Sequence, residues 1–114
     1  MSTDEQKNLY EGMYVISSRL SDEARGHALE KVLDGIKSRN GEIVKMIEMG
    51  RRKLAYEISG HREGYYFLVY FEVAPSAIAE MWNEYHLHED LVRFMTLRAE
   101  SVLENLEFKA LAEA

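Results

Sequence analysis

The sequence predicts an α+β sandwich in which two helices cover one face of a four-stranded antiparallel sheet. Segments with strand character and segments with helical periodicity follow one another in the order strand-helix-strand-strand-helix-strand, within residues 9–98. Right-handed crossovers would place both helices on the same side of such a sheet. The other face of the sheet would then stay uncovered.

The first strand is expected at Leu9–Ser17, which is rich in aromatic and branched residues. Tyr10, Tyr14 and Ile16 share one face of it by the two-residue period of a strand. The polar residues 1–8 before it are expected to form a disordered extension.

The first helix is the clearest element of the sequence. Ser21 can cap its start, and Ala28, Val32 and Ile36 recur every four residues as an apolar stripe. Asn40-Gly41 should end the helix, because glycine adopts the left-handed conformation freely.

A hairpin is predicted next. Glu42–Ser59 reads as a long strand interrupted at Gly50, Gly60–Gly64 as a turn, and Tyr65–Val73 as the returning strand. Alternation assigns two faces to the returning strand. Its uniformly apolar face belongs to the core and consists of Phe67, Val69, Phe71 and Val73. The opposite face is expected to be open and consists of Tyr66, Leu68, Tyr70 and Glu72.

The second helix should open at Pro75-Ser76, since proline suits a helix start and serine can cap. Its predicted core stripe contains Ile78, Met81, Trp82 and Tyr85, so Trp82 is expected to be buried. In the last strand, Leu91–Arg98, the residues expected to face the helices are Val92, Phe94 and Thr96, and those expected on the open face are Arg93, Met95 and Leu97. The elements together predict a split βαβ, ferredoxin-like sandwich. Residues 99–114 form an acidic tail with no evident docking place.

Composition limits the functions that the chain can perform. Its 114 residues fit one domain with 46% hydrophobic and 30% charged residues, and the lack of cysteine excludes disulfides and thiol catalysis. No apolar run approaches the roughly 20 residues of a membrane span, and the N-terminus lacks a secretory signal, so a cytoplasmic location is expected. A net charge of −6 argues against broad nucleic-acid binding. Contact with nucleic acid must be local or shared with a basic partner.

The stretch Gly50–Tyr56 places three consecutive cations within this acidic chain. A glycine followed by charges inside a strand pattern predicts a bulge or bend that projects cations from the sheet edge. A solvated edge that prevents aggregation is the alternative interpretation. The RNA-binding hypothesis assigns phosphate contacts to these and to two cations of the last strand, and its residues are Arg51, Arg52, Lys53, Arg93 and Arg98.

The uncovered sheet face would form a large apolar patch, and patches of this kind usually bind another molecule. The sequence assigns a protein partner to this face. Its expected contact residues are Tyr66, Leu68, Tyr70, Met95 and Leu97.

Enzymatic and metal-binding functions find little support. His86–Asp90 holds two histidines and two acids, but no matching cluster supplies a further ligand. No nucleophile-base pair, phosphate-binding glycine loop or pair of catalytic acids is visible. We therefore expect neither catalysis, nor a cofactor, nor a metal.

Two other functions stay open. Gly64–Phe71 partly follows the RNA-recognition-motif signature, in which aromatic residues of the sheet stack on bases. However, the stacking residues would be Tyr65 and Phe67, on the face assigned to the core. A ferredoxin-like module that senses a small molecule is the third hypothesis.

Four segments together resemble one known family. They are Leu9-Tyr-Glu, Gly50-Arg-Arg-Lys-Leu-Ala-Tyr with Ile58, Gly64-Tyr-Tyr, and Leu91-Val-Arg-Phe-Met. The chain resembles the bacterial small-subunit ribosomal protein S6 family over about residues 9–98, and the second segment is the most specific. Glu57 departs from the family, which commonly has proline at that place.

The resemblance implies a ferredoxin-like fold and a structural, non-enzymatic role in the cytoplasmic ribosome. It further implies a heterodimer with the small, basic ribosomal protein S18. The two proteins together would bind the central domain of the small-subunit ribosomal RNA. This agrees with the charge, because an acidic protein gains affinity for RNA from a basic partner.

Overall fold

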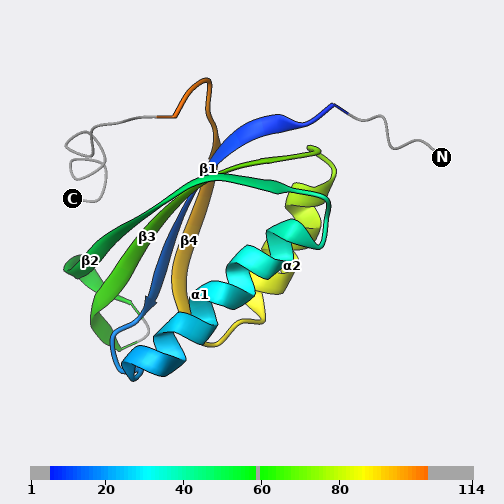
Figure 1. The fold of residues 1–114 in the computed structure, drawn as a ribbon. Coiled ribbons are helices and arrows are strands. Elements are labelled where there is room, and N and C mark those ends of the chain that lie inside the picture. The colour runs from blue at the N-terminus through cyan, green and yellow to red at the C-terminus, as the bar shows by residue number, and fades with distance from the viewer. Residues whose placement is uncertain (1–5, 59, 103–114) are drawn as a thin grey trace.

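The computed structural model describes residues 6–58 and 60–102. Its elements are β1 (Asn8–Ser17), α1 (Asp22–Lys37), β2 (Glu42–Ile58), β3 (His61–Val73), α2 (Ala77–His86) and β4 (Leu91–Arg98). The strands form one antiparallel sheet in the order β2-β3-β1-β4. Both helices lie on the same face of that sheet (Figure 1). The predicted ferredoxin-like sandwich is thus confirmed, while the expectations for residues 1–5 and 103–114 lie outside the described residues.

Helix α1 begins as the sequence predicts and ends differently. The Ser21 hydroxyl accepts a hydrogen bond from the Ala24 amide at 3.1 Å, and the predicted stripe is buried. The left-handed residue after the helix is Asn40, with φ of 61°, and not Gly41. Gly41 is needed for another reason, because a Cβ there would lie 2.6 Å from the Ile36 carbonyl oxygen.

The β2–β3 turn is tighter than predicted. Strand β3 already begins at His61, which pairs with Ile58, so the expected turn over Gly60–Gly64 is wrong. Gly60 has a positive φ of 82° and supplies the reversal. Gly64 lies inside the strand instead, where a Cβ would come within 2.4 Å of Val15 Cγ1. It therefore permits close packing and does not form the turn.

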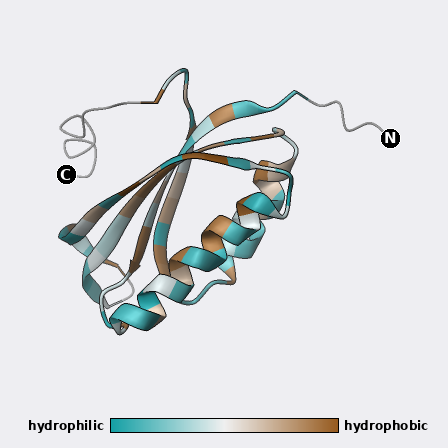
Figure 2. Cartoon of the chain, in the orientation of Figure 1, coloured by the Kyte–Doolittle hydropathy of each residue, from teal (hydrophilic) through white to brown (hydrophobic). Residues whose placement is uncertain are grey.

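The face assignments of β1 and β3 are confirmed. The apolar face of β3 packs with Tyr10, Tyr14 and Ile16 of β1 into one buried cluster beneath the helices. Figure 2 shows that apolar residues run along these strands and along the helices that face them.

Trp82 of α2 does not occupy the predicted core position. The buried residues of this helix are Ala77, Met81 and Tyr85, whereas the Trp82 side chain is 38% exposed. A spacing of four residues defines the buried stripe, and the next residue projects about 100° away from it. Trp82 instead reaches over the edge of β4, where its Nε1 donates to Thr96 Oγ1 at 3.1 Å. The Ser76 side chain also makes none of the predicted capping hydrogen bonds.

A bulge in β4 corrects one further assignment. Ile16 pairs with Leu91 and the preceding residue Val15 pairs with Arg93, so Val92 is an extra residue. Phe94 faces the helices as predicted, but Val92 packs into the cluster on the opposite face of the sheet. The bulge therefore turns both Val92 and Arg93 to that side.

The sheet face away from the helices is not open along its whole length. Tyr66, Leu68 and Tyr70, which the sequence places on an exposed face, are at most 5% exposed. Neighbouring strands and the chain just after β4 cover them, and the covering residues are Leu9, Met13, Ile47, Leu54, Val92, Ala99 and Val102. Residues 99–102 thus dock on the sheet, contrary to the expectation of no docking place. Neither helix within the described residues has the length and apolar character of a membrane span.

Candidate functional site

The three consecutive cations of β2 project from both faces of the sheet. Arg51 is paired with Tyr65, whose ring belongs to the helix-side core, and directly opposed residues share a face. Lys53, two residues on, shares the face of Arg51. Arg52 lies between them and projects to the other face, as does Leu54, which packs into the second cluster. The triplet is therefore not a single patch.

The three cations also differ in how strongly they are held. Arg51 forms a salt bridge with Glu63 on β3, and the hydrogen bond from its guanidinium to that carboxylate raises the arginine pKa. Arg52 is half-buried, and its Nε donates to the Met49 carbonyl at 3.3 Å. Lys53 is exposed and, within the described residues, forms no salt bridge. Lys53 is consequently the most available of the three for a phosphate.

The two predicted cations of β4 lie far apart. Arg93 is paired with Val15, on the face away from the helices, whereas Arg98 is paired with Tyr10, on the helix side. Five residues of strand separate them by about 17 Å. The fold brings Arg93 near the end of β2, but it does not gather the five predicted RNA-binding residues into one surface.

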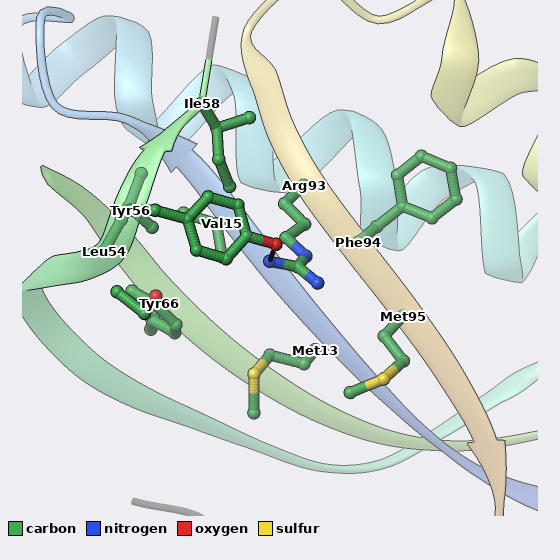
Figure 3. Close-up of a pocket in the computed structure, with 10 residues that line it drawn as sticks. Met13, Val15, Leu54, Tyr56, Ile58, Tyr66, Arg93, Phe94 and Met95 are labelled. Atoms are coloured by element: carbon green, nitrogen blue, oxygen red, sulfur yellow. Dashed lines mark hydrogen bonds between the residues drawn. The ribbon is translucent and has the colours of Figure 1, made fainter. Parts of the chain in front are cut away.

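A pocket of about 300 Å³ lies on the sheet face away from the helices, between the end of β2 and β4. Met13 and Tyr66 contribute to its lining from the central strands, and Met95 does so from β4. Tyr56 and Arg93 reach toward each other across it from β2 and β4 (Figure 3). Arg93 Nη1 donates to the Tyr56 hydroxyl at 3.1 Å, and the guanidinium carbon lies 5.8 Å from the centre of the tyrosine ring.

Only part of the predicted partner face is accessible. Met95 and Leu97 are 41% and 50% exposed, while the three residues of β3 assigned to the same face are buried beneath their neighbours. The exposed part of this face is therefore its β4 side.

Tyr56 is the last residue of the motif Gly50–Tyr56, but the sequence did not indicate that it belongs to the site. Tyr56 is 61% exposed, and the structure places it in the lining of the pocket, beside other apolar residues. Its contact with Arg93 depends on β2 and β4, which are not neighbours in the sheet, and could not be read from spacing.

The histidines of His86–Asp90 do not form a metal site with their neighbours. Among the residues that the structure describes, no group of three or more histidine, aspartate or glutamate side chains is placed to hold a metal ion. His86 instead lies edge-on against Phe94, with the ring centres 5.0 Å apart.

Comparisons with known proteins agree with the fold. The family model described as Ribosomal protein S6 matches residues 9–98. Small ribosomal subunit protein bS6 of Protochlamydia amoebophila is 62% identical over 107 residues, which cover 94% of each chain. The bS6 protein of Chlamydia pneumoniae is 60% identical over 108 residues, covering 95% of this chain and 96% of that protein.

Two solved structures are similar to the model. The crystal structure of 30S ribosomal protein S6 from Thermotoga maritima matches with a TM-score of 0.78 and 32% identity, over 94% of this chain and 97% of that chain. The C-terminal domain of the MgtC protein from Mycobacterium tuberculosis matches with a TM-score of 0.58 and 7% identity, over 92% of this chain and all of that one. The second match concerns the fold alone.

Proposed function

Because the chain belongs to the ribosomal protein S6 family, we propose that it binds the central domain of the small-subunit ribosomal RNA as a heterodimer with the basic ribosomal protein S18. Its membership makes it a non-enzymatic protein of the small subunit of the cytoplasmic ribosome.

The distribution of cations is the observation that carries this proposal. The five arginine and lysine side chains assigned to RNA lie on both faces of the sheet, in a chain with a net charge of −6. Each cation that contacts a phosphate adds affinity through counterion release. Cations on opposite faces of the sheet cannot all contact one RNA surface, so their combined contribution is small. A basic partner would offset the repulsion and supply further phosphate contacts.

The partner surface is proposed on the exposed β4 side of the sheet face away from the helices. Met95 and Leu97 offer apolar area there, and the buried tyrosines and Leu68 support it from beneath. An interface of this kind needs an apolar centre surrounded by polar groups. Tyr66, Leu68 and Tyr70 would then act through packing and not by direct contact.

The test measures affinity for the central-domain RNA at fixed salt, for this protein alone and with purified S18. We expect weak binding alone and tight binding of the pair. Leu97→Glu should weaken the pair, because a buried carboxylate without a partner is costly. Leu87→Glu is the matched control, since Leu87 is 82% exposed after α2 and away from this face. Tight binding of the protein alone, unchanged by S18, would contradict the heterodimer.

The RNA-recognition-motif hypothesis loses its basis. Tyr65 and Phe67, which would have to stack on bases, both pack against the helix-side core. The aromatic side chains of that motif are therefore turned away from the exposed part of the sheet.

A further inference from the structure

The pocket between β2 and β4 combines three chemical features. The exposed ring of Tyr56 and the side chains of Met13 and Met95 contribute to its lining, and Arg93 is the one charged group among the lining residues that the structure describes. The described lining is therefore composed mostly of apolar and aromatic residues and carries one cation.

The contact across the opening is weak enough to exchange. Arg93 donates a single exposed hydrogen bond to the neutral Tyr56 phenol, and within the described residues it forms no salt bridge. A guanidinium has five donor hydrogens in a planar fork that matches a phosphate. A guanidinium and a phosphate carry opposite charges and frequently form two parallel hydrogen bonds, whereas the phenol offers one uncharged acceptor. An anion at this position would therefore replace the phenol as the partner of Arg93.

We propose that the pocket receives one unpaired nucleobase of RNA, which stacks on Tyr56 while the adjoining phosphate binds Arg93. This inference rests on the proposed function, because it names the element of RNA that the protein holds. Aromatic side chains are the usual platforms for bases that are turned out of a helix. The methionine side chains can adapt to the shape of the opposite face of the base.

Charge decides between RNA and protein as the occupant. Among the described lining residues the one charged side chain is a cation, which attracts phosphate and repels the side chains of a basic partner. Arg52 lies two residues before the pocket wall on the same strand and projects to the same face, so the nucleotide chain could continue toward it. The partner would contact the neighbouring Leu97, which does not line the pocket, and Met95 would lie where the two surfaces meet.

The experiment follows the methionine methyl groups by NMR in the full-length protein. Adenosine and uridine monophosphates, a short single-stranded RNA and inorganic phosphate are titrated separately. Met13 and Met95 should shift with the nucleotides and the RNA. Two methionines serve as internal controls and should not shift. Met81 is a buried residue of α2, and Met46 is an exposed residue of β2 that does not line the pocket. If inorganic phosphate shifted Met13 and Met95 as much as the nucleotides do, the base would have no role and the proposal would be overturned.

Variants separate stacking from a structural role. Tyr56→Phe keeps the ring and releases Arg93, so it should bind nucleotides at least as well as the wild type. Tyr56→Ala should lose at least about fivefold in affinity for the RNA, the lower limit for removing one stacking side chain. Trp82→Ala removes a half-exposed aromatic residue from the helix side and should leave the affinity unchanged. Equal affinities of the Phe and Ala variants would contradict stacking.

The outcomes also separate this inference from the proposed function. If the pair with S18 binds the central domain but its affinity is unaffected by Tyr56→Ala, and nucleotides leave Met13 and Met95 unshifted, the pocket proposal alone fails. If the Met13 methyl group shifts with S18 and not with RNA, the pocket is a protein-binding site and the proposal is wrong. If the wild-type pair does not bind the central domain at all, the proposed function fails, whatever the nucleotides do.

Discussion

The hydroxyl oxygens of Tyr14 on β1 and Tyr85 on α2 lie 2.9 Å apart in the core beneath the helices. Their rings meet edge-on with centres 5.3 Å apart, so the pair joins the sheet to α2 by both packing and hydrogen bonding. Burial raises the pKa of Tyr14 well above its usual range, and it raises the pKa of Tyr85 to about 12.

The tyrosine pair predicts a loss of stability at alkaline pH. Above about pH 10 the unfolded chain releases these phenolic protons while the folded protein keeps them. The titration of this pair should therefore leave the unfolding free energy independent of pH below pH 10 and lower it by about 1.4 kcal/mol per pH unit for each tyrosine as the pH rises toward 12. Urea unfolding at several pH values measures this slope. The variant Tyr14→Phe/Tyr85→Phe should have a shallower slope, and an unchanged one would contradict the assignment.

A second prediction concerns the phase of α2. Met81→Ala should lower the unfolding free energy by about 2–5 kcal/mol, because Met81 is 1% exposed and its removal leaves a cavity. Trp82→Ala should cost only about 1 kcal/mol, since the indole is partly in water. Denaturant unfolding of the two variants provides the comparison. A larger loss for Trp82 than for Met81 would show that the helix is rotated.

The cations of β2 and β4 should contribute unequally to the salt dependence of RNA binding. Lys53→Ala and Arg93→Gln should each reduce the slope of log affinity against log salt by roughly 0.7–0.9 in the complex with the partner. Arg51→Ala should reduce it less, because Glu63 already holds the Arg51 guanidinium. Binding measured over a range of salt concentrations tests the order. Equal reductions for Arg51 and Lys53 would mean that the salt bridge opens on RNA.

A buried hydrogen bond beneath the proposed partner face should stabilise the folded protein. The Tyr70 hydroxyl donates to Glu11 Oε2 at 2.7 Å, and both residues are buried. Tyr70→Phe should lower stability by about 1.5–3 kcal/mol, the usual contribution of a hydrogen bond to a charged group. Thermal and urea unfolding measure the loss. If stability were unchanged, water would have to replace the hydroxyl.

The sequence predicts the parts of the fold that depend on local pattern. Ala28, Val32 and Ile36 are buried as their spacing indicates, and Phe67 to Val73 alternate as a strand should. The bulge at Val92 could not be predicted, because no residue type or spacing in this strand marks the position of the extra residue. The covering of Leu68 depends on neighbouring strands and on residues 99–102, which is information that spacing does not contain.

The candidate site was predictable only in part. That Arg51 and Arg52 project to opposite faces follows from the strand assignment itself, and the sequence reasoning did not draw this conclusion. The Tyr56–Arg93 contact, by contrast, joins side chains 37 positions apart. Such a contact depends on the curvature of the sheet and requires the three-dimensional structure.

The extra residue in β4 makes this strand sensitive to changes in chain length. With the bulge, Leu91 and Phe94 both face the helices, although three positions separate them and a regular strand would turn one of them away. Deletion of Val92 would leave only two positions between them and keep both facing the same way, while removing the apolar side chain that covers the buried tyrosines on the other face. Insertion of a residue there would instead turn the side chain of either Leu91 or Arg93 to the opposite face of the sheet. The length of β4 in this protein is therefore constrained by the face of the sheet that each of its side chains must occupy.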